Sequence, residues 1–201
     1  MRFISVLVLL LTLTVVGCDT ASDSPEAKLS IRLTDAPFPF DLAEAADVTI
    51  TRIEALAAEE DGDADNDTSN TEGVRERIVL FDGEPFRLNL LDLRDGVDTL
   101  LVSNVDIPAD GSIDRLRIFV GDDAEVRFFD GTAYPLRLPS AQQSGIKVAL
   151  PDYNVDEDGE IDVLLDFDVE RSFVTRGNPG SANFQGFLFK PVLRVESFQA
   201  E

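Results

Sequence analysis

The 201-residue chain contains no histidine and no tryptophan, and it has a single cysteine, Cys18. The absence of histidine removes the commonest general base and metal ligand, and a lone cysteine forms no disulfide within the chain. Only three of the 17 basic residues are lysines, whereas 39 residues are acidic, so the formal net charge is −22. Such a surface repels nucleic acid and anionic lipid headgroups. We therefore expect no nucleic-acid partner and no binding through a basic patch of the protein.

Aspartate makes up 25 of the acidic residues. An excess of aspartate over lysine is typical of halophilic proteins, in which salt screens the repulsion between acidic groups. An acidic exported protein that binds calcium is the alternative interpretation, and the two are compatible. Without histidine or a free thiol, we expect no enzyme activity.

A short apolar run opens the chain. Arg2 is followed by an apolar stretch from Phe3 to Val16, which is too short to span a bilayer and has the order of a secretory signal. The run ends in Leu13-Thr14-Val15-Val16-Gly17-Cys18, the pattern of a lipobox. We therefore predict a lipoprotein signal peptide over residues 1–17 and a lipid on Cys18. The lipid would hold the exported protein in a membrane of the cell envelope, at the outer membrane or cell surface.

Residues 18–27 are mostly polar and predict a flexible tether, and a single domain is expected over residues 28–199. Within it, apolar and polar residues alternate with the period of half-buried strands, and Asp-Gly pairs mark turns between them. No amphipathic helix of useful length is present. The segments predicted as strands are 29–33, 48–54, 77–81, 86–93, 115–118, 125–128, 134–138, 146–150, 161–169 and 184–195. Nine or ten strands predict an all-β fold, an antiparallel β-sandwich with Greek-key connections of immunoglobulin or transthyretin type.

Two acidic segments are candidate calcium sites. The first has oxygen ligands at alternate positions and Gly159 at the sixth, as at the start of an EF-hand loop. Its candidate ligands are Asn154, Asp156, Asp158, Glu160 and Asp162. Leu165 stands at the twelfth position, where a bidentate glutamate is needed, and the flanks predict strands. An Asp158-Gly159 hairpin turn with positive φ at the glycine is therefore the competing interpretation.

The second acidic segment lies in a long polar stretch over residues 59–73. Its spacing of ligands satisfies a calcium loop better, because a glutamate occupies the twelfth position. Its candidate ligands are Asp61, Asp63, Asp65, Asp67 and Glu72. No glycine stands at the sixth position and nothing apolar anchors the segment, so a solvated acidic loop is the alternative.

Asp166 and Asp168 are two residues apart in a predicted strand, and such a spacing places both carboxylates on one face. A pair of this kind suits a carboxylate-based hydrolase, which is the least favoured function. We favour a structural charge cluster in which Lys147, Arg171 or Arg194 partners the two acids, since a sheet face tolerates such charges only when they are paired.

Ordered blocks over residues 28–196 resemble a bacterial family found in exported lipoproteins, domain of unknown function 4382. The blocks begin with Leu33-Thr34-Asp35-Ala36-Pro37, Val48-Thr49-Ile50, Asn89-Leu90-Leu91-Asp92-Leu93 and Ile107-Pro108-Ala109-Asp110-Gly111. They continue with the segment 138–147, Leu165-Asp166-Phe167-Asp168 and Lys190-Pro191-Val192-Leu193-Arg194-Val195. The resemblance implies a β-sandwich in an envelope lipoprotein, and it implies no activity and no catalytic residues.

From the sequence we predict a non-catalytic, lipid-anchored envelope protein with a binding or architectural role. A calcium-stabilised surface adhesion module is the alternative, with Ca²⁺ as its candidate cofactor. The expected partners are the membrane, through the lipid on Cys18, and an unidentified surface ligand or envelope protein.

Overall fold

The computed structural model describes residues 25–35, 42–57, 77–136 and 144–201 of the chain. These residues form thirteen strands and two helices of one turn, so the prediction of an all-β fold is confirmed. The strands are β1 (Glu26–Asp35), β2 (Ala43–Ala57), β3 (Arg77–Phe81), β4 (Phe86–Asn89), β5 (Asp98–Pro108), β6 (Ile113–Val120), β7 (Glu125–Phe128), β8 (Ala133–Pro135), β9 (Ile146–Ala149), β10 (Glu160–Phe167), β11 (Phe173–Thr175), β12 (Phe187–Phe189) and β13 (Leu193–Ala200). The helices are η1 (Leu90–Leu93), a 3-10 helix, and α1 (Val169–Ser172). Within the described ranges, no helix is long and apolar enough to cross a membrane.

The number of strands, thirteen, exceeds the nine or ten that the sequence predicts. Three elements make the difference. β5 does not alternate regularly, β11 has only three residues, and the predicted strand 184–195 is divided into β12 and β13. The strands also begin at Glu26, two residues before the predicted start of the domain.

One sheet has seven strands and is built around β2, which is fifteen residues long. The first part of β2 lies between β7 and β4, and its second part lies between β6 and β3. β8 continues the sheet beyond β7, and β9 continues it beyond β6. All of these pairs are antiparallel.

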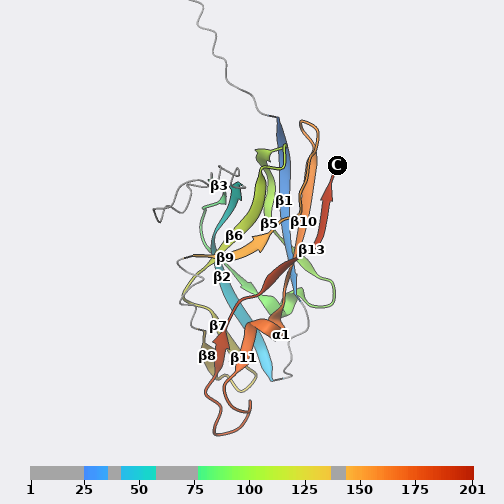
Figure 1. Ribbon diagram of the computed structural model, residues 1–201. Helices are drawn as coiled ribbons and strands as arrows, with labels where there is room; N and C mark the ends of the chain where they lie inside the picture. The colour runs from blue at the N-terminus through green and yellow to red at the C-terminus, as the bar shows by residue number, and fades with distance from the viewer. Residues whose placement is uncertain (1–24, 36–41, 58–76, 137–143) are drawn as a thin grey trace, which may run out of the picture.

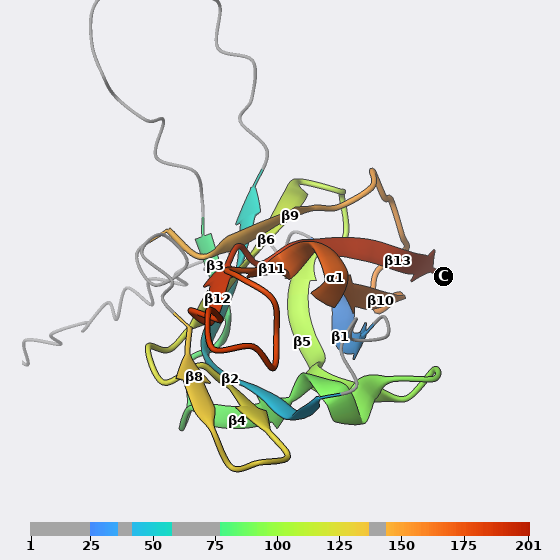
Figure 2. The same cartoon turned by 90° about the horizontal axis from the view of Figure 1, so that it is seen from below.

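The second sheet has four strands in the order β13-β10-β1-β5. Its pairs are antiparallel except for β1 and β10, which run parallel from Lys28 opposite Glu160 to Asp35 opposite Phe167. β11 and β12 form a separate hairpin. Figure 2 shows this hairpin and α1 over the end of the molecule that carries β8.

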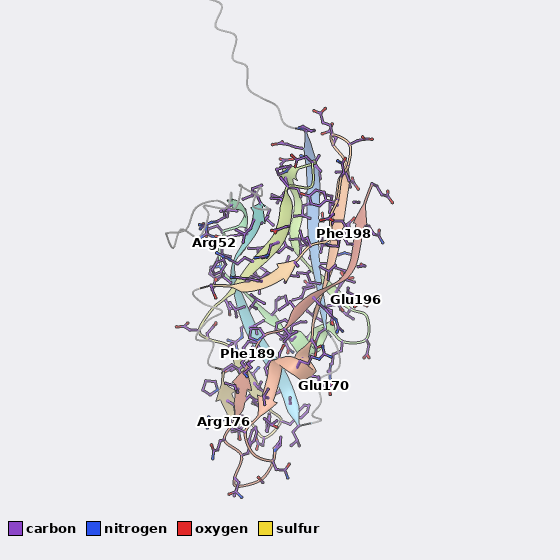
Figure 3. The ribbon with its side chains drawn as sticks, in the orientation of Figure 1. Arg52, Glu170, Arg176, Phe189, Glu196 and Phe198 are labelled. Carbon is purple, nitrogen blue, oxygen red and sulfur yellow. The ribbon has the colours of Figure 1, made fainter. Side chains whose placement is uncertain are left out.

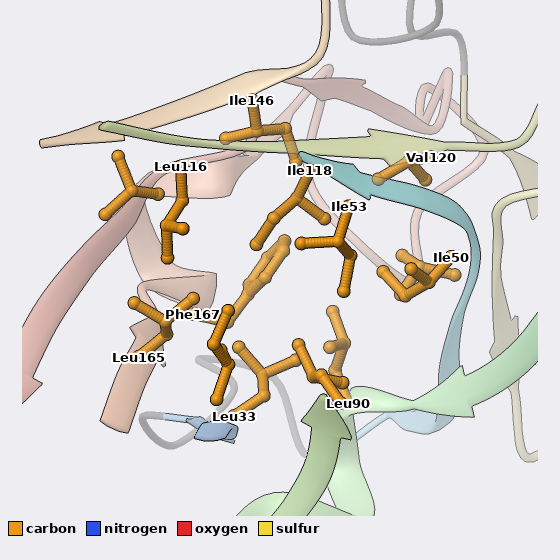
Figure 4. Packing of buried hydrophobic residues seen from close by; sticks show 14 of the residues in the cluster. Leu33, Ile50, Ile53, Leu90, Leu116, Ile118, Val120, Ile146, Leu165 and Phe167 are labelled. Atoms are coloured by element: carbon orange, nitrogen blue, oxygen red, sulfur yellow. The ribbon is translucent and has the colours of Figure 1, made fainter. Parts of the chain in front are cut away.

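The two larger sheets face each other across one apolar core, which confirms the predicted β-sandwich. Along β1, Leu29, Ile31 and Leu33 are buried, as the period of two requires when one face of a strand is covered. Figure 4 shows Leu33 and Leu165 of the four-stranded sheet on one side of the core, with Ile53 and Ile118 of the seven-stranded sheet on the other. The fold is long in one direction: Figure 1 places the start of β1 at the upper end and β8 and β11 at the lower end.

Candidate functional site

The predicted charge cluster is assembled on the outer side of the four-stranded sheet. Asp166 is buried in β10, and its Oδ2 lies 2.7 Å from Nη2 of Arg194 on the neighbouring β13. Nη1 of Arg194 lies 3.6 Å from Oδ2 of Asp168, and Arg171 contacts the same oxygen at 3.5 Å. Lys147 does not take part, because it lies exposed on β9 in the other sheet.

The prediction that Asp168 shares a strand face with Asp166 is wrong. The strand ends at Phe167, and Asp168 is the N-cap of α1, where its Oδ1 accepts a hydrogen bond of 3.0 Å from the backbone N–H of Arg171. Burial raises the pKa of Asp166 above its ordinary value, although the adjacent Arg194 guanidinium lowers it. In the structure, Asp166 is thus paired with Arg194, and Asp168 caps α1.

The first candidate calcium segment forms a turn that joins three strands. The N–H of Asp158 donates to the carbonyl of Glu26, the N–H of Lys28 donates to the carbonyl of Gly159, and Glu160 exchanges two hydrogen bonds with Glu201. These bonds, of 2.8 to 3.0 Å, tie the start of β10 to β1 and β13. The predicted positive φ at Gly159 is wrong, since Asp158 has it, with φ of 63°.

Gly159 is required for a different reason, the close approach of backbone. A Cβ at this position would lie 2.7 Å from the carbonyl oxygen of Glu201 and 2.8 Å from that of Asp156. Two of the candidate ligands, Glu160 and Asp162, belong to strand β10. No group of three or more acidic side chains in the described part of the chain is placed to hold a metal ion. The second candidate segment, residues 61–72, lies outside the described residues, as does Cys18.

Aromatic rings gather at the lower end of the molecule, where the separate hairpin meets the seven-stranded sheet. Tyr134 of β8 packs against Phe184 and Phe128, with ring centroids 4.8 and 5.1 Å apart, and Phe184 lies 5.2 Å from Phe187. Gly186 permits this packing, because a Cβ there would lie 3.3 Å from Tyr134 Cδ1. Its φ of +87° also favours glycine.

A pocket of 240 Å³ opens beside this aromatic cluster. It is lined by Tyr134, Pro135, Arg176, Gln185, Gly186, Phe187 and Leu188. Nη2 of Arg176 donates to Oε1 of Gln185 at 3.1 Å, and two backbone bonds between Arg176 and residues 185 and 186 hold both side chains at the rim. Figure 3 shows Arg176 at the lower end of the molecule. An aromatic wall with one cation and one amide is the composition of sites that bind small polar ligands.

The family model described as "Domain of unknown function (DUF4382)" matches residues 26–191. The chain belongs to this family. The predicted resemblance is therefore confirmed, and the matched residues run from the first residue of β1 to a point just before β13. Comparisons of the DUF4382 chain with curated proteins and with solved structures found no match.

All residues that line the pocket fall within the match to the DUF4382 model. The sequence does not predict the pocket, because no motif links Tyr134 to Arg176 and Gln185. Residues 184–195 are predicted as one strand, and this prediction misses the positive φ of Gly186, next to which the N–H of Gln185 donates to the carbonyl of Arg176. The only sequence signal is the segment Asn178-Pro179-Gly180, whose composition is typical of a long hairpin loop.

Proposed function

We propose that this DUF4382 protein is a non-catalytic, lipid-anchored binding module of the bacterial cell envelope. The pocket beside Tyr134 would receive the ligand. One observation carries the proposal: the strand that follows the predicted lipid anchor begins at the end of the molecule opposite the pocket (Figure 1). A protein held at Cys18 would therefore present Arg176 and Gln185 away from the membrane.

The chemistry of the pocket supports binding rather than catalysis. The chain has no histidine, and its only cysteine is assigned to the lipid. The pocket residues supply a guanidinium, an amide and a phenol, which can hold a ligand by hydrogen bonds and stacking. Its 240 Å³ is below the roughly 300–1,000 Å³ of sites that enclose drug-sized ligands, so it suits a single sugar ring or side chain of an envelope polymer.

The anchor is tested by the Cys18→Ala variant of the full chain. We expect the unsubstituted protein to incorporate labelled fatty acid and to enter the detergent phase in a partition assay. Because the variant lacks the thiol that accepts the lipid, it should remain unlabelled and stay in the aqueous phase. Equal detergent partitioning of the two proteins would contradict lipid anchoring.

The pocket is tested by fluorescence, because a chain without tryptophan leaves tyrosine emission visible. In a Tyr153→Phe background, Tyr134 is the only tyrosine and reports directly on the pocket. We expect a saturable change in its emission with one class of monosaccharide among neutral, N-acetylated and uronic sugars. Arg176→Gln should weaken that binding about tenfold, since it removes a charged donor from the rim.

Arg171→Gln is the matched control for the fluorescence test. Its side chain is 71% exposed and pairs only with Asp168 among the described residues, outside the pocket. It should bind as the parent does. No saturable response to any of these sugars, or equal losses in both variants, would contradict the assignment of the pocket.

A further inference from the structure

A carboxylate is completely buried on the outer side of the seven-stranded sheet, among three arginines. The Glu54 side chain is 0% exposed, and its Oε1 lies 2.7 Å from Nη2 of Arg52 and 3.6 Å from Nη1 of Arg77. Its Oε2 lies 3.9 Å from Nη1 of Arg117. Among the described residues, three guanidinium groups thus surround one carboxylate, and positive charge is in excess around Glu54.

Register places two further cations beside this group. Arg117 of β6 pairs with Glu54 on one side and with Lys147 of β9 on the other, and directly opposed residues of an antiparallel pair project to the same face. Arg115 lies two residues before Arg117 and therefore shares that face. We call the five cations Arg52, Arg77, Arg115, Arg117 and Lys147 the basic face.

The basic face is a local exception in a chain with a net charge of −22. In the described part of the chain, the acids that pair with it are Glu54 and Asp114, the latter 3.8 Å from Arg115, so five positive charges meet two negative ones. The net charge does not reveal the basic face, because its five cations come from four separate segments of the sequence, the strands β2, β3, β6 and β9.

The outer N–H groups of the basic face remain suited to a ligand. Each guanidinium has five N–H donors, whereas one carboxylate has about four lone-pair sites, so Glu54 cannot accept from most of the donors of the three groups. Arg77 and Arg117 approach Glu54 only at 3.6 and 3.9 Å, which is beyond good hydrogen-bond distance. Their side chains are 52% and 24% exposed, and Lys147 is exposed as well.

We propose that the basic face binds a linear anionic polysaccharide whose carboxylate or sulfate groups are repeated along the chain. The strand order here is β3-β2-β6-β9, with about 4.8 Å between neighbouring strands. Arg77 of β3 and Arg117 of β6 therefore lie on either side of Glu54 of β2, and Lys147 of β9 follows Arg117, so the cations form a track across the sheet. Arginine suits such groups because its planar fork binds carboxylate and sulfate oxygens in pairs.

A flat anionic membrane fits the basic face less well than a single polymer chain does. The same sheet carries Asp47, Asp123 and Glu125 around Arg87, at 2.9 to 4.0 Å. A plane of anionic headgroups would meet these acids and the rest of the acidic surface together with the basic face, whereas a chain can follow the cations alone. The basic face is also separate from the pocket, since Figure 3 shows Arg52 on the side of the molecule and Arg176 at its lower end.

The test measures binding of the full chain, purified in a neutral detergent, to oligomers of polygalacturonate by calorimetry at several salt concentrations. We expect saturable binding to the polyuronate and none to neutral dextran. Arg77→Gln together with Lys147→Gln should weaken binding about tenfold, since each exposed ion pair contributes a few-fold. The matched control, Lys28→Gln with Arg32→Gln, removes the same charge from the four-stranded sheet and should leave affinity within twofold.

Glu54→Gln gives a prediction of opposite sign. It removes the internal anion and frees the three guanidinium groups, so polyuronate should bind about threefold more tightly. Equal weakening by the control pair, or unchanged affinity in Glu54→Gln, would overturn the proposal. So would binding to vesicles of phosphatidylglycerol without binding to polyuronate. Melting temperatures of all variants confirm that each is folded.

Discussion

Gly111→Ala is expected to lower the free energy of unfolding by about 3 kcal/mol or more. Gly111 has a φ of +77°, in the left-handed region, where a residue with a side chain is strained by about 1 kcal/mol or more. A Cβ would also lie 2.0 Å from the carbonyl oxygen of Tyr153, well inside van der Waals contact. Overpacking of this kind typically costs about 1–3 kcal/mol further, because backbone must move.

The backbone around Gly111 has little freedom to relax. Tyr153 Oη donates to the carbonyl of Pro108 at 3.0 Å, and the N–H of Val155 donates to the carbonyl of Ala109 at 3.2 Å. Burial raises the pKa of Tyr153 to about 12, so the phenol stays protonated and keeps this bond through neutral pH. The loop that presents the carbonyl is thus held against the turn by bonds from Tyr153 itself and from Val155.

Gly96→Ala is the matched control, since Gly96 has a similar φ of +82° but nothing lies within 4 Å of its Cβ position. It should lower the free energy of unfolding by only about 1 kcal/mol, because the strain of the positive φ is present but the steric contact is not. Urea denaturation at one fixed salt concentration measures both variants, because guanidinium would itself screen the acidic surface. Equal costs for the two substitutions would show that the contact with Tyr153 contributes nothing.

Turns and regular strands are the parts of this fold that sequence reveals best. The Asp-Gly pairs at Asp95, Asp110 and Asp130 each precede a glycine with positive φ, as the turn chemistry requires. β1 buries every second residue, as does β6 from Leu116 onward, so their alternation is visible without any knowledge of partners.

β5 shows where the prediction of strands from alternating apolar and polar residues fails. Leu101 and Val102 are adjacent and both buried, whereas Leu100 is 54% exposed, so its apolar residues do not alternate. The register with β1 shifts between Leu29 and Ile31, and Asn104 has a φ of 50°. An irregularity of this kind changes which face each later residue occupies, and it cannot be predicted from the local sequence.

The sites depend on pairing between distant segments, which a single sequence does not specify. Asp166 and Asp168 are visible as a motif, but only the register of β10 with β13 selects Arg194 rather than Lys147 as the partner. The basic face is hidden more completely. Its cations lie between residues 52 and 147, among many more acids, and the predicted repulsion of anions follows from counting charges without placing them.

Leu165→Ala is expected to lower the free energy of unfolding by about 3 kcal/mol, within the range of about 2–5 kcal/mol for such truncations. Leu165 is fully buried at the centre of the four-stranded sheet, between Leu33 of β1 and Val195 of β13. Truncation removes apolar contacts and leaves a cavity that two fixed neighbouring strands cannot close.

Leu164→Ala is the control, one residue away on the opposite face of β10. Its side chain is only partly buried, so the same loss of three carbon atoms should cost about 1 kcal/mol or less. Urea denaturation of both variants in molar salt gives the comparison. Because successive residues of a strand alternate between faces, a cost for Leu164 equal to that for Leu165 would mean that β10 has a different register in solution, with Asp166 turned toward the core. The larger cost for Leu165 would establish that Asp166 and its partner Arg194 lie on the outer face.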